Sequence, residues 1–121
     1  MSLADNKCIP CRGGVPPLTE SQAMNLLGQL DSSWELTNSA THLQRSYLFK
    51  NFVHAMDFAN KLADVAEEEG HHPELHIGWG KCTVDLWTHK INGLTESDFF
   101  LAAKSDRVLE IVRSATEGIQ P

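Results

Sequence analysis

Four of the six histidines of the chain lie between positions 71 and 89. His71 and His72 are adjacent and are followed by Pro73, and His89 closes the segment. Because the ordinary pKa of histidine lies near neutrality, two neighbouring rings favour one neutral and one protonated form. A base and an acid in one pocket suit a reaction that removes one proton and delivers another. A lone histidine at a strand end is more simply explained by a hydrogen bond to the backbone, so the functional interpretation depends on the convergence of three rings.

A β-hairpin would bring these histidines together. Apolar and polar residues alternate on both sides of Gly80-Lys81, which is the period of strands with one buried face. A two-residue type II′ turn at Gly80-Lys81 predicts a register in which Trp79 faces Cys82. The other pairs of this register are Ile77 with Val84, Leu75 with Leu86, His76 with Asp85, Glu74 with Trp87 and His72 with His89. The last pair predicts a histidine cluster at the open end of the hairpin.

A metal site is the alternative interpretation of these residues. His71, His72 and His89 could supply three nitrogen ligands to zinc. Adjacent residues of an extended chain point to opposite faces, and no carboxylate is expected to orient the rings, so metal binding is the weaker hypothesis. Cys8-Ile9-Pro10-Cys11 has the spacing of half a zinc site or of a redox pair, but no second pair accompanies it. Cys82 is expected to be a small core residue.

Three helices and a second hairpin are expected around the histidine segment. The capping box Thr19-Glu20-Ser21-Gln22 predicts a first helix that runs to about Leu30. Extended segments at 34–37 and 43–49, separated by Asn38-Ser39, predict a hairpin, and Trp34 is expected in the core or as a shielding wall. A second helix is predicted over 51–69 with Gly70 as its cap. A second capping box, 95–98, predicts a final helix that runs to about Ser114.

Length and composition limit the classes of protein that the chain can represent. At 121 residues and 41% hydrophobic residues, the chain suits one domain, predicted over 18–121 after a flexible N-terminal arm over 1–17. A net charge of −6 without a basic patch disfavours direct binding of nucleic acid. No apolar run approaches the roughly 20 residues of a membrane-spanning helix, and residues 1–7 lack the charged-then-apolar pattern of a secretory signal. Three cysteines do not suit a disulfide framework, so we expect a cytoplasmic location.

The sequence resembles the pterin-4a-carbinolamine dehydratases, a family whose mammalian member also serves as dimerisation cofactor of a homeodomain transcription factor. The resemblance covers roughly residues 18–115 and rests on Glu67, His71-His72-Pro73, Trp79, His89 and Asp98. It implies an α+β domain with a four-stranded antiparallel sheet and three helices packed on one face, assembled into dimers or tetramers. It also implies a hydro-lyase that dehydrates 4a-hydroxytetrahydrobiopterin to quinonoid dihydropterin in tetrahydrobiopterin recycling, with no metal or organic cofactor.

The same resemblance implies roles for individual residues. His71 and His89 would act as acid and base in an unassigned order, His72 would bind and orient the pterin, and Asp98, which also completes a capping box, would support catalysis. The implied substrate-binding residues are His71, His72, Pro73, Thr88, His89, Lys90, Glu67 and Trp87. Thr88 and Lys90 could offer backbone groups to the pterin, whereas Trp87 could stack on its flat ring or simply lie at a sheet or subunit surface.

A non-catalytic module is the alternative function. Such a module would bind a protein partner or drive oligomerisation, as a transcriptional coactivator or an assembly factor does. The presence of all three histidines favours the enzyme, because a scaffold has no need of an acid and a base.

Overall fold

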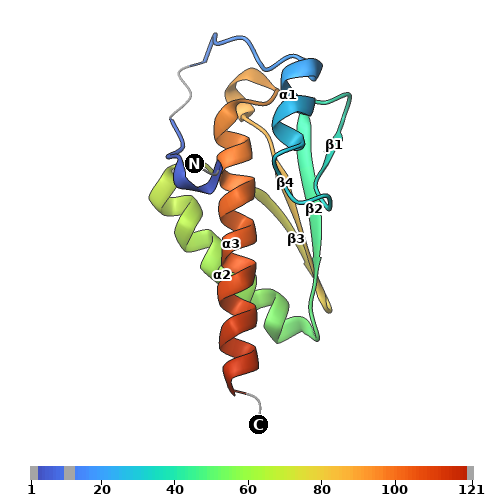
Figure 1. Cartoon of the computed structure of the whole chain (residues 1–121), viewed down its shortest axis with the longest axis vertical. Helices are drawn as coiled ribbons and strands as arrows, with labels where there is room; N and C mark the ends of the chain where they lie inside the picture. The colour runs from blue at the N-terminus through green and yellow to red at the C-terminus, as the bar shows by residue number, and fades with distance from the viewer. Residues whose placement is uncertain (1–2, 10–12, 120–121) are drawn as a thin grey trace.

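The computed structural model describes residues 3–9 and 13–119, and one antiparallel sheet with three α-helices packed against it forms the fold (Figure 1). The strands lie in the order β1-β2-β4-β3. This is the α+β fold that the sequence predicted. The elements along the chain are η1 Leu3–Asp5, α1 Glu20–Leu27, β1 Glu35–Thr37, β2 His42–Leu48, α2 Phe52–Glu69, β3 Glu74–Gly78, β4 Lys81–Leu86, η2 His89–Ile91 and α3 Glu96–Ile119.

The helices begin where the capping residues predicted, but α1 and α3 end at other residues than predicted. Thr19 and Gln22 form the reciprocal capping box of α1, and the αL residue Gly70 (φ 66°) ends α2. Helix α1 ends at Leu27 rather than Leu30, because Gly28 is a poor helix former and the chain continues in tighter turns. Helix α3 runs to Ile119 rather than Ser114. Within the described ranges, no helix combines the length and apolar character needed to span a membrane.

The two faces of the sheet differ in polarity, as the two-residue period predicted. The side chains of the central strands that face the helices are almost fully buried; they are Leu43, Tyr47, Cys82, Val84 and Leu86. Cys82 is therefore the small core residue that the sequence predicted. Alternating positions carry polar residues on the other face, where the hydroxyl groups of Ser46 and Thr83 are 2.8 Å apart. Trp87, which lines the site described below, follows the end of β4.

The register of the β3–β4 hairpin differs from the prediction by two residues. The turn residues are Trp79 and Gly80, so Gly78 pairs with Lys81. The other pairs that replace the predicted ones are Ile77 with Cys82, Leu75 with Val84, His76 with Thr83 and Glu74 with Asp85. Gly80 takes the positive φ of the turn (69°), and its carbonyl accepts the Phe49 N–H at 2.7 Å, which anchors the turn to the end of β2. Trp79, predicted to face Cys82, is instead 77% exposed.

A polar cluster joins α3 to β2 on the face of the sheet that packs against the helices. The carboxylate of Asp106 accepts hydrogen bonds from the Trp34 indole, the Tyr47 hydroxyl and the Arg45 guanidinium. Burial raises the pKa of Asp106, and the three donors oppose that rise. Trp34 is 3% exposed, so it belongs to the core, as predicted.

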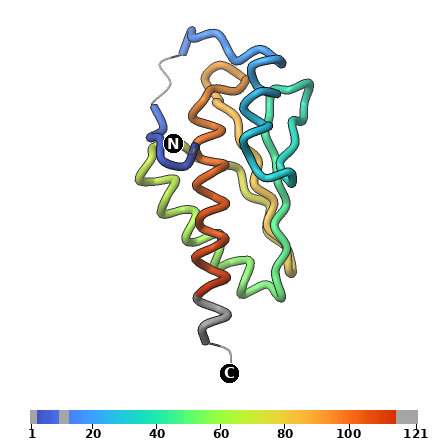
Figure 2. The backbone as a smooth tube through the Cα atoms, in the orientation of Figure 1, coloured from blue at the N-terminus to red at the C-terminus, as the bar shows by residue number. Residues whose placement is uncertain are grey.

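The described part of the N-terminal segment packs beside α3 and the end of α2 (Figure 2). The Cys8 N–H donates to Glu69 Oε1 at 2.8 Å, and Lys104 Nζ donates to the Ala4 carbonyl at 2.9 Å. The bond from Cys8 and the nearby Lys104 charge lower the pKa of Glu69. Cys11, the other cysteine of the predicted pair, lies outside the described residues. The flexibility predicted for residues 1–17 stays a prediction.

Replacing Gly80 with alanine should destabilise the protein. A Cβ at this position would lie 2.9 Å from the Phe49 carbonyl oxygen, and the positive φ disfavours any L side chain. We expect Gly80→Ala to lower the free energy of unfolding by about 2 kcal/mol. Gly78→Ala is the matched control, because nothing lies within 4 Å of the position its methyl group would take and its φ is outside the left-handed region; it should change stability by less than about 0.5 kcal/mol. Equal effects in urea unfolding would contradict this account of the turn.

The two described cysteines should react slowly while the protein is folded. Burial, reinforced by the Glu69 charge, raises the pKa of Cys8 to about 12, and burial raises that of Cys82 to about 11. Both thiols therefore stay protonated at pH 8, where only a thiolate attacks an aromatic disulfide reagent. In a Cys11→Ser variant, which isolates these two thiols, we expect reaction at least about 100-fold slower than that of free cysteine. The same variant in guanidinium is the control, and fast reaction before unfolding would contradict the prediction.

Candidate active site

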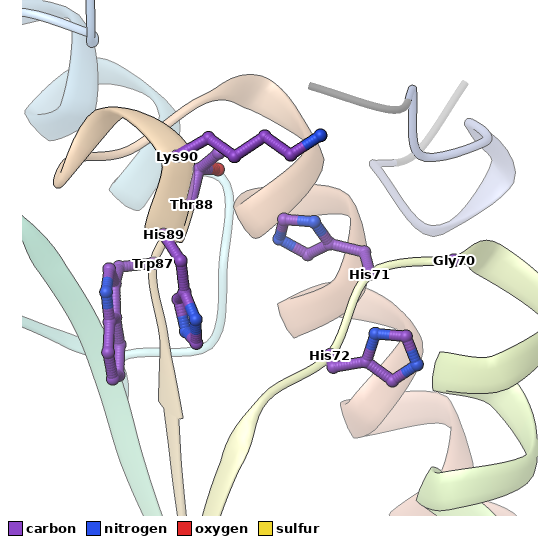
Figure 3. A pocket seen from close by; sticks show the side chains of 7 residues that line it. All are labelled: Gly70, His71, His72, Trp87, Thr88, His89 and Lys90. Carbon is purple, nitrogen blue, oxygen red and sulfur yellow. The ribbon is translucent and has the colours of Figure 1, made fainter. Parts of the chain in front are cut away.

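A cavity of about 250 Å³ opens where the end of α2 meets the end of β4 (Figure 3). Its size suits a small molecule rather than a macromolecule. The residues that line it are Gly70, His71, His72, Trp87, Thr88, His89 and Lys90. All but Gly70 were predicted as site residues from the sequence, and Gly70 was predicted only as a helix cap. Among the other predicted site residues, Pro73 is outside the cavity lining, while Glu67 and Asp98 reach the site through hydrogen bonds to histidines.

Two connecting segments, rather than the predicted strand pairs, bring the histidines together. Strand β3 begins only at Glu74, so His71 and His72 lie in the link that leaves Gly70. On the other side, β4 ends at Leu86, and residues 88–93 form a tight loop that contains η2. The predicted pairing of His72 with His89 is therefore wrong, although both side chains line one cavity.

His71 is fixed by a buried carboxylate. Its Nε2 lies 2.6 Å from Asp98 Oδ1, with the two side chains 12% and 0% exposed. The other oxygen of Asp98 accepts the Thr88 hydroxyl at 2.8 Å and the Thr95 N–H at 2.9 Å. Three hydrogen-bond donors thus surround the Asp98 carboxylate. Because a carboxylate only accepts, the hydrogen of the His71–Asp98 bond lies on Nε2 of His71. That leaves Nδ1 of His71 as the ring nitrogen that can exchange a proton with a ligand.

His72 has a different environment. Its Nε2 lies 2.6 Å from Glu67 Oε2, but the two side chains are 60% and 77% exposed. An ion pair in such contact with water contributes little to stability. The sequence did not predict a carboxylate beside either ring, and the structure corrects this: Asp98 and Glu67 orient His71 and His72, one from the first turn of α3 and the other from the last turn of α2.

The loop after β4 presents His89 and Lys90 to the cavity. The Thr88 N–H donates to the Gly93 carbonyl at 2.8 Å, and Asn92 takes the αL conformation that closes the loop. The Thr88 carbonyl accepts from Ile91 and Gly93. The backbone of Thr88 is engaged within the loop and its hydroxyl is bonded to Asp98, so Thr88 shapes the site; binding of a ligand by its backbone stays a prediction.

Trp87 lies between two imidazole rings. Its ring centroid is 4.3 Å from that of His89, with 28° between the planes, and 4.0 Å from that of His42, with 11° between the planes. His42 in turn lies 3.1 Å from Asp85 Oδ1. Neither His42 nor Asp85 was predicted as part of the site, because the link depends on the pairing of β2 with β4, which connects segments over 40 residues apart.

The described ranges contain no group of three or more His, Cys, Asp or Glu side chains arranged to hold a metal ion. The arrangement supports another kind of chemistry. Two imidazoles on facing walls of a small cavity, one of them bonded to a buried carboxylate, can deliver and accept protons at two atoms of one bound molecule.

Comparison with known proteins identifies the family. The family described as Pterin 4 alpha carbinolamine dehydratase matches residues 16–108. Relatives named for this dehydratase in Rickettsia canadensis (strain McKiel) and Rickettsia bellii (strain OSU 85-389) are 58% and 55% identical, over 84% and 87% of this chain and 93% and 92% of theirs. A solved structure described as a transcriptional coactivator/pterin dehydratase from Brucella melitensis is 36% identical, with a TM-score of 0.71 over 76% of this chain and 97% of that one. The chain therefore belongs to the pterin-4a-carbinolamine dehydratase family.

Proposed function

We propose that this protein removes water from a 4a-hydroxytetrahydropterin, with 4a-hydroxytetrahydrobiopterin as the substrate. In this reaction the bond between C4a and the hydroxyl oxygen breaks, the proton on N5 leaves, and a C4a–N5 double bond forms. The hydroxyl group leaves as water once it has received a proton. The products are water and a quinonoid dihydropterin, and no electrons are gained or lost overall. The reaction therefore needs one acid and one base, and no net supply of protons.

The observation that carries this proposal is the position of His71 and His89. The two rings come from different connecting segments and lie on opposite sides of the cavity (Figure 3). A flat substrate bound between the two rings would have one of its edges near each ring. One histidine can then protonate the leaving hydroxyl while the other takes the proton from N5, in an order that the proposal leaves open.

Asp98 supports the role of His71. By holding Nε2, the carboxylate fixes the tautomer and the ring plane, and it stabilises the ring when Nδ1 also carries a proton. His72 suits a binding role better than a proton-transfer role. Its ring points toward α2, away from His89, where Glu67 holds it at the cavity rim (Figure 3). The cytoplasmic location expected from the cysteine content, and the assembly into dimers or tetramers implied by the family resemblance, stay predictions.

Dehydration of freshly generated 4a-hydroxytetrahydropterin tests the proposal directly. Stopped-flow ultraviolet absorbance follows the reaction, and the spontaneous rate supplies the baseline. We expect the protein to accelerate dehydration, and His71→Ala or His89→Ala to lower kcat by roughly 10²- to 10⁴-fold or to the limit set by the spontaneous rate. The double variant should not exceed that spontaneous rate.

His76→Ala is the matched control, since His76 is an exposed histidine of β3 that does not line the cavity. It should retain the activity of the unchanged protein. Absence of acceleration by folded, unchanged protein would reject the dehydratase. Full activity of the double variant would reject this site.

The two carboxylates that hold the histidines should contribute unequally. Asp98 is fully buried with three donors, so its replacement disturbs the His71 tautomer, the Thr88 hydroxyl and the first turn of α3 together. We expect Asp98→Asn to lower kcat by roughly 10- to 100-fold. Glu67→Gln makes the same chemical change at an exposed pair and should lower kcat by less than about fivefold. Thermal unfolding monitors the fold of both variants, and a larger kcat effect for Glu67→Gln would contradict the assignment.

A further inference from the structure

His89 differs from the other two site histidines in what holds its ring. Carboxylates hold His71 and His72 at 2.6 Å. For the exposed His89 side chain, the described part of the chain provides no hydrogen-bond partner, and the contact that sets its plane is the stack on Trp87. The orientation of His89 therefore depends on where the Trp87 ring lies.

Trp87 has a ring against each face of its indole. His89 lies on the face turned toward His71, whereas strand β2, which carries His42, runs on the other side of the indole (Figure 3). The strand pair Leu43–Leu86 places His42 opposite Trp87 in the adjacent position of the ladder. The indole is thus stacked against an imidazole on each side. These contacts give Trp87 a role toward its protein neighbours, while its stacking on a pterin stays a prediction.

His42 is itself held at both ring nitrogens. Nδ1 lies 3.1 and 3.3 Å from the two oxygens of Asp85, and Nε2 lies 3.4 Å from Asn38 Nδ2. A carboxylate accepts and an amide nitrogen donates, so Nδ1–H donates to Asp85 while Nε2 accepts from Asn38. The side chains of His42 and Asp85 are only 17% and 15% exposed. These hydrogen bonds therefore fix the orientation of the His42 ring, and one face of the ring packs against the Trp87 indole.

We propose that His42, held by Asp85, is a positioning residue for His89 and acts through Trp87. The three rings form one stack that runs from β2, across β4, to the cavity wall. Asp85 thus contributes to the orientation of His89 through two stacked rings, whereas Asp98 contacts His71 directly and also fixes its tautomer. The inference rests on the proposed function, in which His89 exchanges a proton with the substrate.

Substitutions at His42 test whether its stacking on Trp87 orients His89. His42→Ala removes the ring that backs Trp87, and His42→Phe keeps a flat ring but loses the bonds to Asp85 and Asn38. His76→Ala is the matched control, because it removes an exposed histidine from β3, outside the stack. All variants are made in the full chain, and thermal unfolding verifies that each is folded.

The direct readout is the NMR signal of the His89 ring protons in protein with ¹³C-labelled histidine, assigned by its loss in His89→Gln. The ring current of Trp87 shifts these protons upfield while the rings are stacked. We expect the shift to move toward the value of an unstacked histidine in His42→Ala, to be largely retained in His42→Phe, and to stay unchanged in His76→Ala. This readout requires no substrate and no activity.

The kinetic readout tests whether positioning matters for the reaction. We expect His42→Ala to lower kcat by about 5- to 20-fold with KM changed by less than about twofold, because the acid and base groups remain but His89 is misaligned. His42→Phe should recover most of that loss, and His76→Ala should show none.

Each outcome decides a separate point. An unchanged His89 signal in a folded His42→Ala protein would overturn the stack as the positioning device, whatever the activity. A displaced signal with unchanged kcat would overturn its role in the reaction. Failure of the unchanged protein to dehydrate the pterin would instead reject the proposed function, and the NMR shift would still decide whether His42 orients His89.

Discussion

The buried carboxylate of Asp98 is the interaction on which the site depends. It belongs to the first turn of α3, and it accepts hydrogen bonds from the Thr95 N–H just before the helix, from the Thr88 hydroxyl after β4 and from His71 after α2. The link after α2, the loop after β4 and the start of α3 therefore meet at one group with no exposure to solvent. A buried carboxylate is costly unless its oxygens are satisfied, so the cap of α3 and the shape of the site are set by the same requirement.

Much of this architecture is local and could be predicted from the sequence. The capping box at Thr19, the bond from the Thr95 N–H to Asp98, and Gly70 after α2 mark helix ends through contacts between residues three or four apart. The alternation of apolar and polar residues in β3 and β4 predicted which face of each strand is buried. The histidine spacing, together with the family resemblance, predicted six of the residues that line the cavity.

What escaped prediction depends on contacts between distant segments. The sequence shows that Asp98 can cap α3, but not that its second oxygen reaches His71, because the packing of α3 against the end of α2 has no local signal. The sequence pattern around His42 indicates only an ordinary half-buried strand. It becomes part of the site only through the pairing of β2 with β4, which places it beside Trp87. The sequence separation of Asp98 from His71 also explains why no carboxylate was expected beside that ring. Glu67, in contrast, lies only five residues before His72 and was missed because its contact crosses the end of α2.

The two-residue error in the predicted hairpin has a consequence for how the chain folds. A slip of two residues keeps every side chain on its own face, so Leu75 and Ile77 meet apolar partners in either register. Burial of apolar surface thus distinguishes poorly between two competing ladders, which is a local frustration of the energy landscape. A few directional contacts favour the observed register. They are the positive φ of Gly80, the hydrogen bond from the Phe49 N–H to the Gly80 carbonyl, and the hydrogen bonds at the opposite end of the hairpin. A chain that closed in the slipped ladder would keep its apolar residues on the buried face but lose these directional contacts, so the polar ends of the hairpin select its register.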